Sequence, residues 1–194
     1  RTAQQALYDF CNDTLSATYL AAVKDRLYCD SEDSERRLQT VSTITRISNV
    51  LVKLLAPFMP HTADEAWRSI HEDSTCVQLE NFESFLFEAS PDWATVFEVR
   101  DLALKALEEA KSDGIENALD AGLILPSSVD AFDVCDLADL CGVSRVRCEG
   151  NAVVVEDLKE EPRCDRSWKR DGTVKLRDDG GMLSDRDAKA VGVE

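Results

Sequence analysis

The chain has 194 residues, of which 44% are hydrophobic and 31% are charged, and its formal net charge is −16. This length suits one large domain or two small ones with an apolar core, and periodic apolar runs exclude a fully disordered chain. No run of about 18 apolar residues predicts a membrane span, and no signal-peptide pattern opens the sequence. Because the first residue is Arg1, we expect a piece of a longer protein.

The acidic charge is concentrated in the middle of the chain. Residues 71–162 hold 6 Lys and Arg against 22 Asp and Glu, a net charge of −16. Residues 1–70 have a net charge of −1, and residues 163–194 have a net charge of +1. Nucleic-acid-binding proteins usually carry a basic patch. The total charge therefore argues against nucleic acid, whereas the distribution leaves both ends open to it.

Seven cysteines are spread without regular spacing, and an odd number does not suit a closed set of disulfides. Secreted disulfide scaffolds are also shorter and richer in cysteine than this chain. We therefore expect a reducing, cytoplasmic compartment in which the thiols are mostly buried.

Helical periodicity dominates residues 1–112, and it predicts the first two helices over residues 2–28 and 35–56. A polar, acidic loop separates these helices, and Pro57 and Pro60 end the second one because proline disfavours helical continuation. The face opposite the apolar stripe of the second helix carries no acidic residue, which is unusual in so acidic a chain. That face consists of Gln39, Ser42, Arg46, Asn49 and Lys53.

Two further helices are predicted from their start signals. Thr62 and Glu65 have the spacing of a capping box, which predicts the start of a third helix. Ser90-Pro91 provides an N-cap followed by proline at the first helical position, and the helix it opens continues to about Lys111. The segment from Cys76 to Phe87 is expected to be irregular or short-stranded.

Residues 113–161 predict a small α+β unit, with one short helix within residues 129–141. Residues 121–125 are a short apolar run that Pro126 closes, and residues 143–148 and 152–156 are rich in β-favouring residues. Residues 149–151 have the composition of a hairpin turn between these two predicted strands. Residues 162–194 form a polar tail with too few apolar residues for a core of its own. The predicted fold class is mainly α, a helical bundle followed by the α+β unit and an irregular tail.

Sequence signals of catalysis are absent. No phosphate-binding G-x-x-x-x-G-K-[ST] loop or G-x-G-x-x-G turn occurs. The two histidines, His61 and His71, have no pattern of cysteines or carboxylates around them that would predict a nucleophile or a metal site. The residues by themselves therefore indicate an accessory module.

Several blocks, in order, resemble the anticodon-binding helical domain of class I aminoacyl-tRNA synthetases. They are LSATYLAAVKDRLY at 15–28, RRLQT at 36–40 and LLAPFMPHTADEAW at 54–67. The first block is most similar to the isoleucyl-tRNA synthetases of the bacterial type. IENALDA at 115–121 resembles a linking region of that family, with Glu116 in place of the usual glycine and Asp120 in place of the usual glutamate.

The tail resembles a zinc knuckle that has lost most of its ligands. Bacterial members of this family end in C-x-x-C-W, a spacer and C-x-x-C, whose four thiolates bind zinc tetrahedrally. Here the corresponding positions are Cys164, Ser167, Ser184 and Asp187, and Trp168 is retained. One thiolate with two hydroxyls and a carboxylate is a poor site for a soft metal, so we expect no zinc. A site made from Cys135, Cys141, Cys148 and Cys164 lacks paired spacing and is disfavoured.

The resemblance implies a tRNA-binding part of a longer enzyme. In this family, the catalytic domain carries the HIGH and KMSKS motifs and uses ATP to activate isoleucine. Neither motif occurs here, so we expect no aminoacylation by this chain alone. The implied partners are tRNA(Ile) and the catalytic and editing domains of the same longer chain. We expect no cofactor in this part, and we expect the whole protein to be a monomer. Two alternatives stay open: the corresponding part of a valyl-tRNA synthetase, and a non-catalytic module that binds protein partners through its acidic middle.

Binding an anticodon stem and loop requires cations along the phosphates and planar groups for unpaired bases. The candidate tRNA-binding residues are Lys24, Arg26, Arg36, Arg37, Arg46, Lys53, Arg166, Trp168, Lys169 and Arg170. The alternative for the cations is a solvated helix face or, for Lys24 and Arg26, pairing between domains. Cations surround Trp168, which suits a base-stacking platform, although it could instead anchor the tail by packing. Trp67 and Trp93 are expected in the core.

Overall fold

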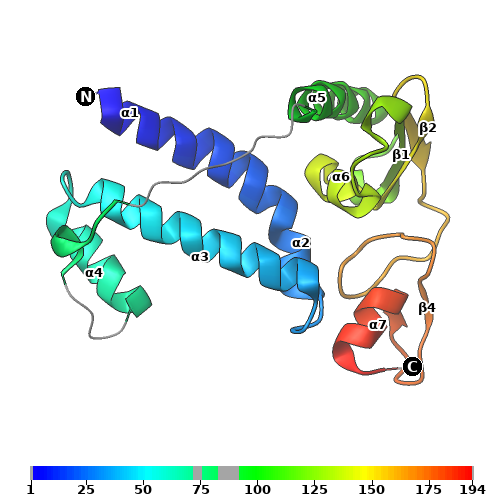
Figure 1. The fold of residues 1–194 in the computed structure, drawn as a ribbon. Helices are drawn as coiled ribbons and strands as arrows, with labels where there is room; N and C mark the ends of the chain where they lie inside the picture. Colours follow the sequence, from blue (N-terminus) through cyan, green and yellow to red (C-terminus); the bar gives the residue numbers. More distant parts are fainter. Residues whose placement is uncertain (1, 72–75, 83–91, 194) are drawn as a thin grey trace. The chain divides into compact units, whose positions relative to one another are not determined.

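The computed structural model describes residues 2–71, 76–82 and 92–193. The chain divides into two compact units, one formed by Arg1–Ser34 with Ser90–Glu194 and the other by Glu35–Ala89. The first, called unit 1, thus joins the N-terminal helix to the C-terminal half, and the second is called unit 2 (Figure 1). No helix within the described ranges is long and apolar enough to cross a membrane.

The N-terminal helix of unit 1 runs without a break from Thr2 to Cys29, which confirms the predicted helix. Its parts are α1 (Thr2–Asp9), the π-helical η1 (Phe10–Leu20) and α2 (Ala21–Cys29). Only Val23 and Cys29 of this helix are buried. Its structural anchor in unit 1 is therefore its C-terminal end, α2.

A three-stranded sheet and two helices form the centre of unit 1. The elements are α5 (Trp93–Ala110), η3 (Ala118–Asp120), β1 (Ala121–Pro126), η4 (Ser127–Val129), α6 (Val134–Cys141), β2 (Arg145–Gly150) and β3 (Val154–Asp157). The strand order is β2-β1-β3, with β1 parallel to β2 and antiparallel to β3. The predicted hairpin between the last two strands is therefore wrong, because β1 lies between them.

The reason for this order is the composition of β1. Leu123 is 0% exposed and Leu125 is 1% exposed, so the strand is too apolar for an edge and takes the central position. Parallel pairing with β2 requires a crossover connection, which α6 supplies. The helix predicted over residues 129–141 is shorter than expected. It begins at Val134, because the carboxylate of Asp133 accepts from backbone amides of the first turn and caps the helix there.

The core of unit 1 lies between α5, α6 and the sheet. Its buried side chains come from one face of α5, from β1, from η4, and from α6 with the residue pair that follows it. They include Val96, Ala103, Leu123, Leu125, Val129, Leu137, Ala138 and Val143. The expectation of mostly buried thiols is only partly met, because Cys29, Cys141 and Cys164 are buried whereas Cys135 is exposed.

The tail is more regular than its sequence predicts. It contains β4 (Lys175–Leu176), β5 (Met182–Leu183) and α7 (Asp185–Val191), and the two short strands pair antiparallel. The expected absence of a core is wrong, because Cys164, Val174, Leu183 and Ala188 form a small buried cluster. This core needs few apolar residues because hydrogen-bonded polar side chains, Ser184 and Asp187 among them, fill the rest of the buried space.

Unit 2 contains α3 (Glu35–Leu55), α4 (Pro60–His71) and η2 (Val77–Leu79), which confirms the second and third predicted helices. Its core consists of Val52, Ala56, Ala63, Trp67 and Val77. The predicted capping box is wrong, because α4 begins at Pro60, where a missing amide hydrogen costs nothing. The helix start predicted at Ser90-Pro91 and residues 83–87 lie outside the described residues.

Candidate functional site

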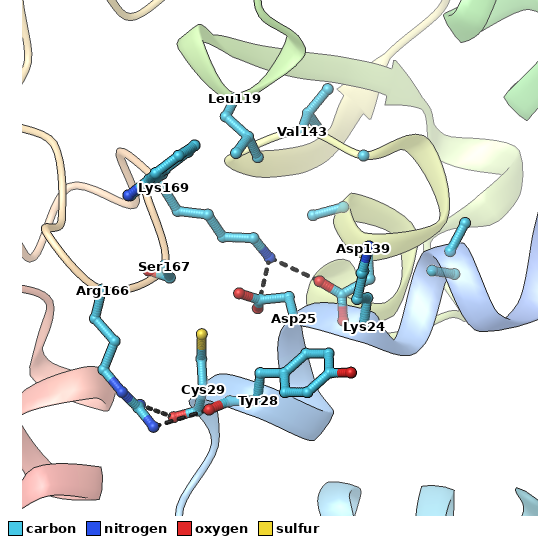
Figure 2. Close-up of a pocket in the computed structure, with 15 residues that line it drawn as sticks. Lys24, Asp25, Tyr28, Cys29, Leu119, Asp139, Val143, Arg166, Ser167 and Lys169 are labelled. Atoms are coloured by element: carbon cyan, nitrogen blue, oxygen red, sulfur yellow. Dashed lines mark hydrogen bonds and ion pairs between the residues drawn. The ribbon is translucent and has the colours of Figure 1, made fainter.

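The candidate site is a cavity of about 540 Å³ in unit 1. Its walls come from α2, from α6 with the loop that follows it, and from residues 166–169 of the tail (Figure 2). These segments are far apart in the sequence, so the cavity exists only because the tail returns to the N-terminal helix.

Lys169 joins two of these walls. Its Nζ lies 2.7 Å from Oδ1 of Asp139 and 3.1 Å from Oδ2 of Asp25 (Figure 2). The guanidinium of Arg26 also contacts α6, with Nη2 2.9 Å from Oδ2 of Asp139 and 2.7 Å from Oδ1 of Asp136. Burial alone would lower the pKa of Lys169, but the charges of Asp139 and Asp25 raise it above its ordinary value. The buried charges of this wall therefore balance one another.

Two arginines of the tail hold the C-terminal end of α2. The guanidinium of Arg166 donates to the backbone carbonyls of Cys29 and of Tyr28, the latter at 2.9 Å (Figure 2). Such carbonyls have no partner within their own helix and carry the negative end of its dipole. Arg186 lies 2.5 Å from Asp25, and although burial alone would raise the pKa of Asp25, Arg186 and Lys169 lower it.

The outward-facing groups of the site are aromatic and cationic. Trp168 is 55% exposed and Tyr28 is 72% exposed, and both line the cavity together with the exposed Lys24. The guanidinium carbon of Arg163 lies 5.6 Å from the centre of the Trp168 ring. With φ at 64°, Trp168 is the one non-glycine residue in the described ranges with a positive φ. Its exposed position is therefore held by a backbone conformation that few side chains adopt.

Four of the predicted tRNA-binding residues line this cavity, namely Lys24, Arg166, Trp168 and Lys169. Arg26 does not line it but pairs with Asp139, which does. Arg170 lies beside them and pairs with Asp120 at 2.8 Å. For Arg26, the alternative of pairing within the chain describes its position, because its guanidinium contacts α6.

The other predicted cations lie in unit 2. Arg36, Arg37, Arg46 and Lys53 are all on α3. Lys53 does not lie on an open cationic face, because it is only 8% exposed and its Nζ stands 5.3 Å from the centre of the Trp67 ring. Trp67 is a core residue, as predicted, whereas Trp93 is 46% exposed, so that its expected place in the core is wrong.

Sequence reasoning missed Asp25 and Asp139, the carboxylates that hold the tail. The one signal was the alternation of charge in Lys24-Asp25-Arg26, which is common on solvated helices and does not single out a partner. The partners of Asp25 in the tail, Lys169 and Arg186, lie more than 100 residues away along the chain, and no local pattern contains such a contact.

Comparison with known proteins identifies the family. Residues 1–121 match the anticodon-binding domain of tRNA ligases. The chain belongs to this family of anticodon-binding domains. It is 31% identical to the isoleucine–tRNA ligase of Agrobacterium fabrum over 96% of this chain and 22% of that protein. It is 36% identical to that of Brevibacillus brevis, over 82% of this chain and 19% of the relative.

A third relative, the isoleucine–tRNA ligase of Methylacidiphilum infernorum, is 38% identical over 85% of this chain and 19% of its own length. The chain thus spans about a fifth of the length of these relatives. The resemblance predicted from the sequence, to the anticodon-binding region of isoleucine–tRNA ligases, is confirmed.

The zinc knuckle that the family resemblance implies does not fit the residues of this tail. A soft metal requires several thiolate or imidazole lone pairs, and among the four corresponding positions only Cys164 has a thiol. That thiol lies 3.2 Å from a carboxylate oxygen of Asp187 and is engaged with it. Within the described residues, no three His, Cys, Asp or Glu side chains are placed to share a metal ion.

Proposed function

We propose that this chain is the part of an isoleucine–tRNA ligase that binds the anticodon stem and loop of tRNA(Ile). The family match over residues 1–121 and the similarity to isoleucine–tRNA ligases support this function. This sequence lacks the HIGH and KMSKS motifs, so ATP-dependent aminoacylation would belong to a catalytic domain elsewhere in a longer enzyme. We propose that this enzyme is cytoplasmic and monomeric.

The observation that carries the proposal is the exposed indole of Trp168 at the cavity. Unpaired bases of RNA loops are bound by stacking on aromatic or guanidinium planes. An indole that is 55% exposed, with the guanidinium of Arg163 over its ring, offers both kinds of surface. Tyr28 and Lys24 add a second aromatic ring and a cation on the same cavity.

The buried cations have a different role in this proposal. Arg26, Lys169 and Arg170 each pair with at least one carboxylate of unit 1. Because those charges are already balanced, we assign these residues to positioning the tail and not to phosphate contact. Arg166 likewise positions α2 through its backbone acceptors.

The test is binding of a labelled tRNA(Ile) transcript to the purified chain at low salt. Each stacked base contributes about 1–3 kcal/mol, so Trp168→Ala is expected to raise Kd by about five- to 150-fold. Leu176→Ala is the matched control, because Leu176 is also an exposed apolar residue of the tail, at 68% exposure, and lies outside the cavity. Equal Kd values for the two variants would contradict the stacking role.

The same experiment separates the alternative of a protein-binding module. If the wild-type chain shows no salt-sensitive binding to tRNA(Ile), the proposed function is wrong and a protein partner for the acidic residues becomes the better hypothesis. A valine-specific origin would instead appear as tighter binding to tRNA(Val) than to tRNA(Ile).

A further inference from the structure

The four knuckle positions of the tail converge in space although three of them lack a thiolate. Ser167 Oγ lies 2.7 Å from Oδ2 of Asp187, Ser184 Oγ lies 2.8 Å from it, and Cys164 Sγ lies 3.2 Å from it. Three of the positions thus donate to a single oxygen of the fourth. The two turns of the frame, at residues 164–167 and 184–187, are joined at this carboxylate.

Three of the four positions are buried, and the fourth, Ser167, is half-buried. Asp187 and Cys164 are 0% exposed, and Ser184 is 1% exposed. A buried carboxylate is costly unless it is paired and fully hydrogen-bonded. Arg166 meets Oδ1 at 3.0 Å and Arg186 meets Oδ2 at 3.1 Å, so both oxygens of Asp187 have charged partners.

The ionisation of Asp187 agrees with this geometry. Burial alone would raise its pKa, but the hydrogen bond from Ser167, the charge of Arg186 and the bonds from Ser184 and Cys164 together lower it to about 2. The carboxylate is therefore an anion at neutral pH, as an acceptor of five donors must be.

Backbone hydrogen bonds complete the two turns around this centre. The amide of Trp168 donates to the carbonyl of Cys164 at 2.9 Å, and the amide of Cys164 donates to Lys169 at 2.9 Å. In the second turn, the amide of Asp187 donates to Ser184 Oγ at 3.1 Å while Ser184 donates back to the carboxylate. The bond from the amide of Asp187 makes Ser184 the N-cap of α7.

We propose that the tail is a metal-independent knuckle in which the carboxylate of Asp187 takes the place of the zinc ion. A zinc ion would join the turns by accepting lone pairs from four thiolates, whereas this anion joins them by accepting hydrogen bonds from hydroxyl, thiol and guanidinium donors. The cluster also fixes the turn that carries Trp168. The inference concerns folding of the tail and does not depend on tRNA binding.

The first test uses the wild-type chain. Metal analysis of the purified protein is expected to find no stoichiometric zinc, and amide hydrogen exchange of residues 162–193 is expected to be the same with and without a chelator. Stoichiometric zinc, or exchange that rises when chelator is added, would overturn the proposal without any variant being needed.

The second test removes the charge of the centre. Asp187→Asn keeps the shape of the side chain but removes the carboxylate partner of Arg166 and one of the carboxylate partners of Arg186. It also places an amide NH2 donor next to the hydroxyl, thiol and guanidinium donors. We expect exchange at residues 162–193 to rise about tenfold or more. Asp178→Asn makes the same chemical change at an exposed position of the tail and is expected to leave exchange unchanged. Equal exchange in the two variants would contradict the central role of Asp187.

The third test restores the thiolates. Ser167→Cys, Ser184→Cys and Asp187→Cys, combined with the native Cys164, would place four thiols at the positions that now meet. If the frame is a knuckle, this variant binds one zinc ion per chain and its exchange becomes sensitive to chelator. A triple variant that binds no zinc would show that the four positions do not have knuckle geometry.

Discussion

Asp25 and Lys169 show how single side chains hold the tail of this domain. Asp25 accepts from Arg186 and Lys169, and Lys169 reaches on to Asp139, so that a chain of alternating charges links the tail, α2 and α6. Losing one partner of such a pair leaves a buried charge without compensation. Lys169 was a candidate from the sequence because cations surround Trp168, but its pairing with Asp25 and Asp139 was not predictable, since those partners come from other parts of the chain.

The shifted pKa values predict how stability depends on pH. The pKa of Asp25 is lowered from 3.8, so its stabilisation is present above pH 3.8 and is lost as pH falls through the lowered value. The pKa of Lys169 is raised from 10.5, so its stabilisation is present below pH 10.5 and is lost as pH rises through the raised value. We therefore expect the free energy of unfolding to fall beyond both limits.

Lys169→Met isolates the alkaline part of this prediction. The variant is expected to be less stable by about 1–3 kcal/mol at neutral pH, because it leaves Asp139 and Asp25 with fewer donors. The difference from wild type should shrink above pH 10.5, as Lys169 loses its proton. Denaturant unfolding across this pH range measures it, and a difference that does not change with pH would contradict the assignment.

At the scale of elements, the positions of the helices could be predicted from the sequence, whereas the order of the strands in the sheet could not. The helices of residues 1–112 were predictable because their periodicity is local, and β2 and β3 because their β-favouring residues are contiguous. The sequence of β1 showed only a short apolar run, which does not distinguish a strand from other buried segments. The strand order was not predictable, since the choice between a hairpin and a crossover depends on which strand is buried on both faces. β1 decides this order through Leu123 and Leu125.

The end of α6 provides a test at this scale. Gly142 has φ at 72°, and a Cβ at this position would meet no atom within 4 Å. Gly142→Ala is therefore expected to cost about 1 kcal/mol through backbone strain alone, and thermal unfolding measures it. Gly142→Asn should cost less, because Asn tolerates this conformation. An alanine variant as stable as wild type would show that the left-handed cap is unimportant.

At the scale of the whole molecule, the acidity of the middle segment has a structural use. Its Asp120, Asp136 and Asp139 pair with cations from α2 and from the tail. The net charge of −16 therefore does not describe the charge of the surface that we propose for tRNA. The distribution of charge was visible in the sequence, but the pairing was not, because it depends on the return of the tail to α2.

Binding of tRNA by this chain is tested most directly with two transcripts of tRNA(Ile) that differ only in the anticodon loop. We expect tighter binding of the native loop, with log K falling by about 0.7 per unit rise in log salt concentration for each neutralised phosphate of a single strand. We also expect Trp168→Ala to abolish the preference for the native loop. Equal affinity of the wild-type chain for both transcripts, or binding that is independent of salt, would contradict the proposed function.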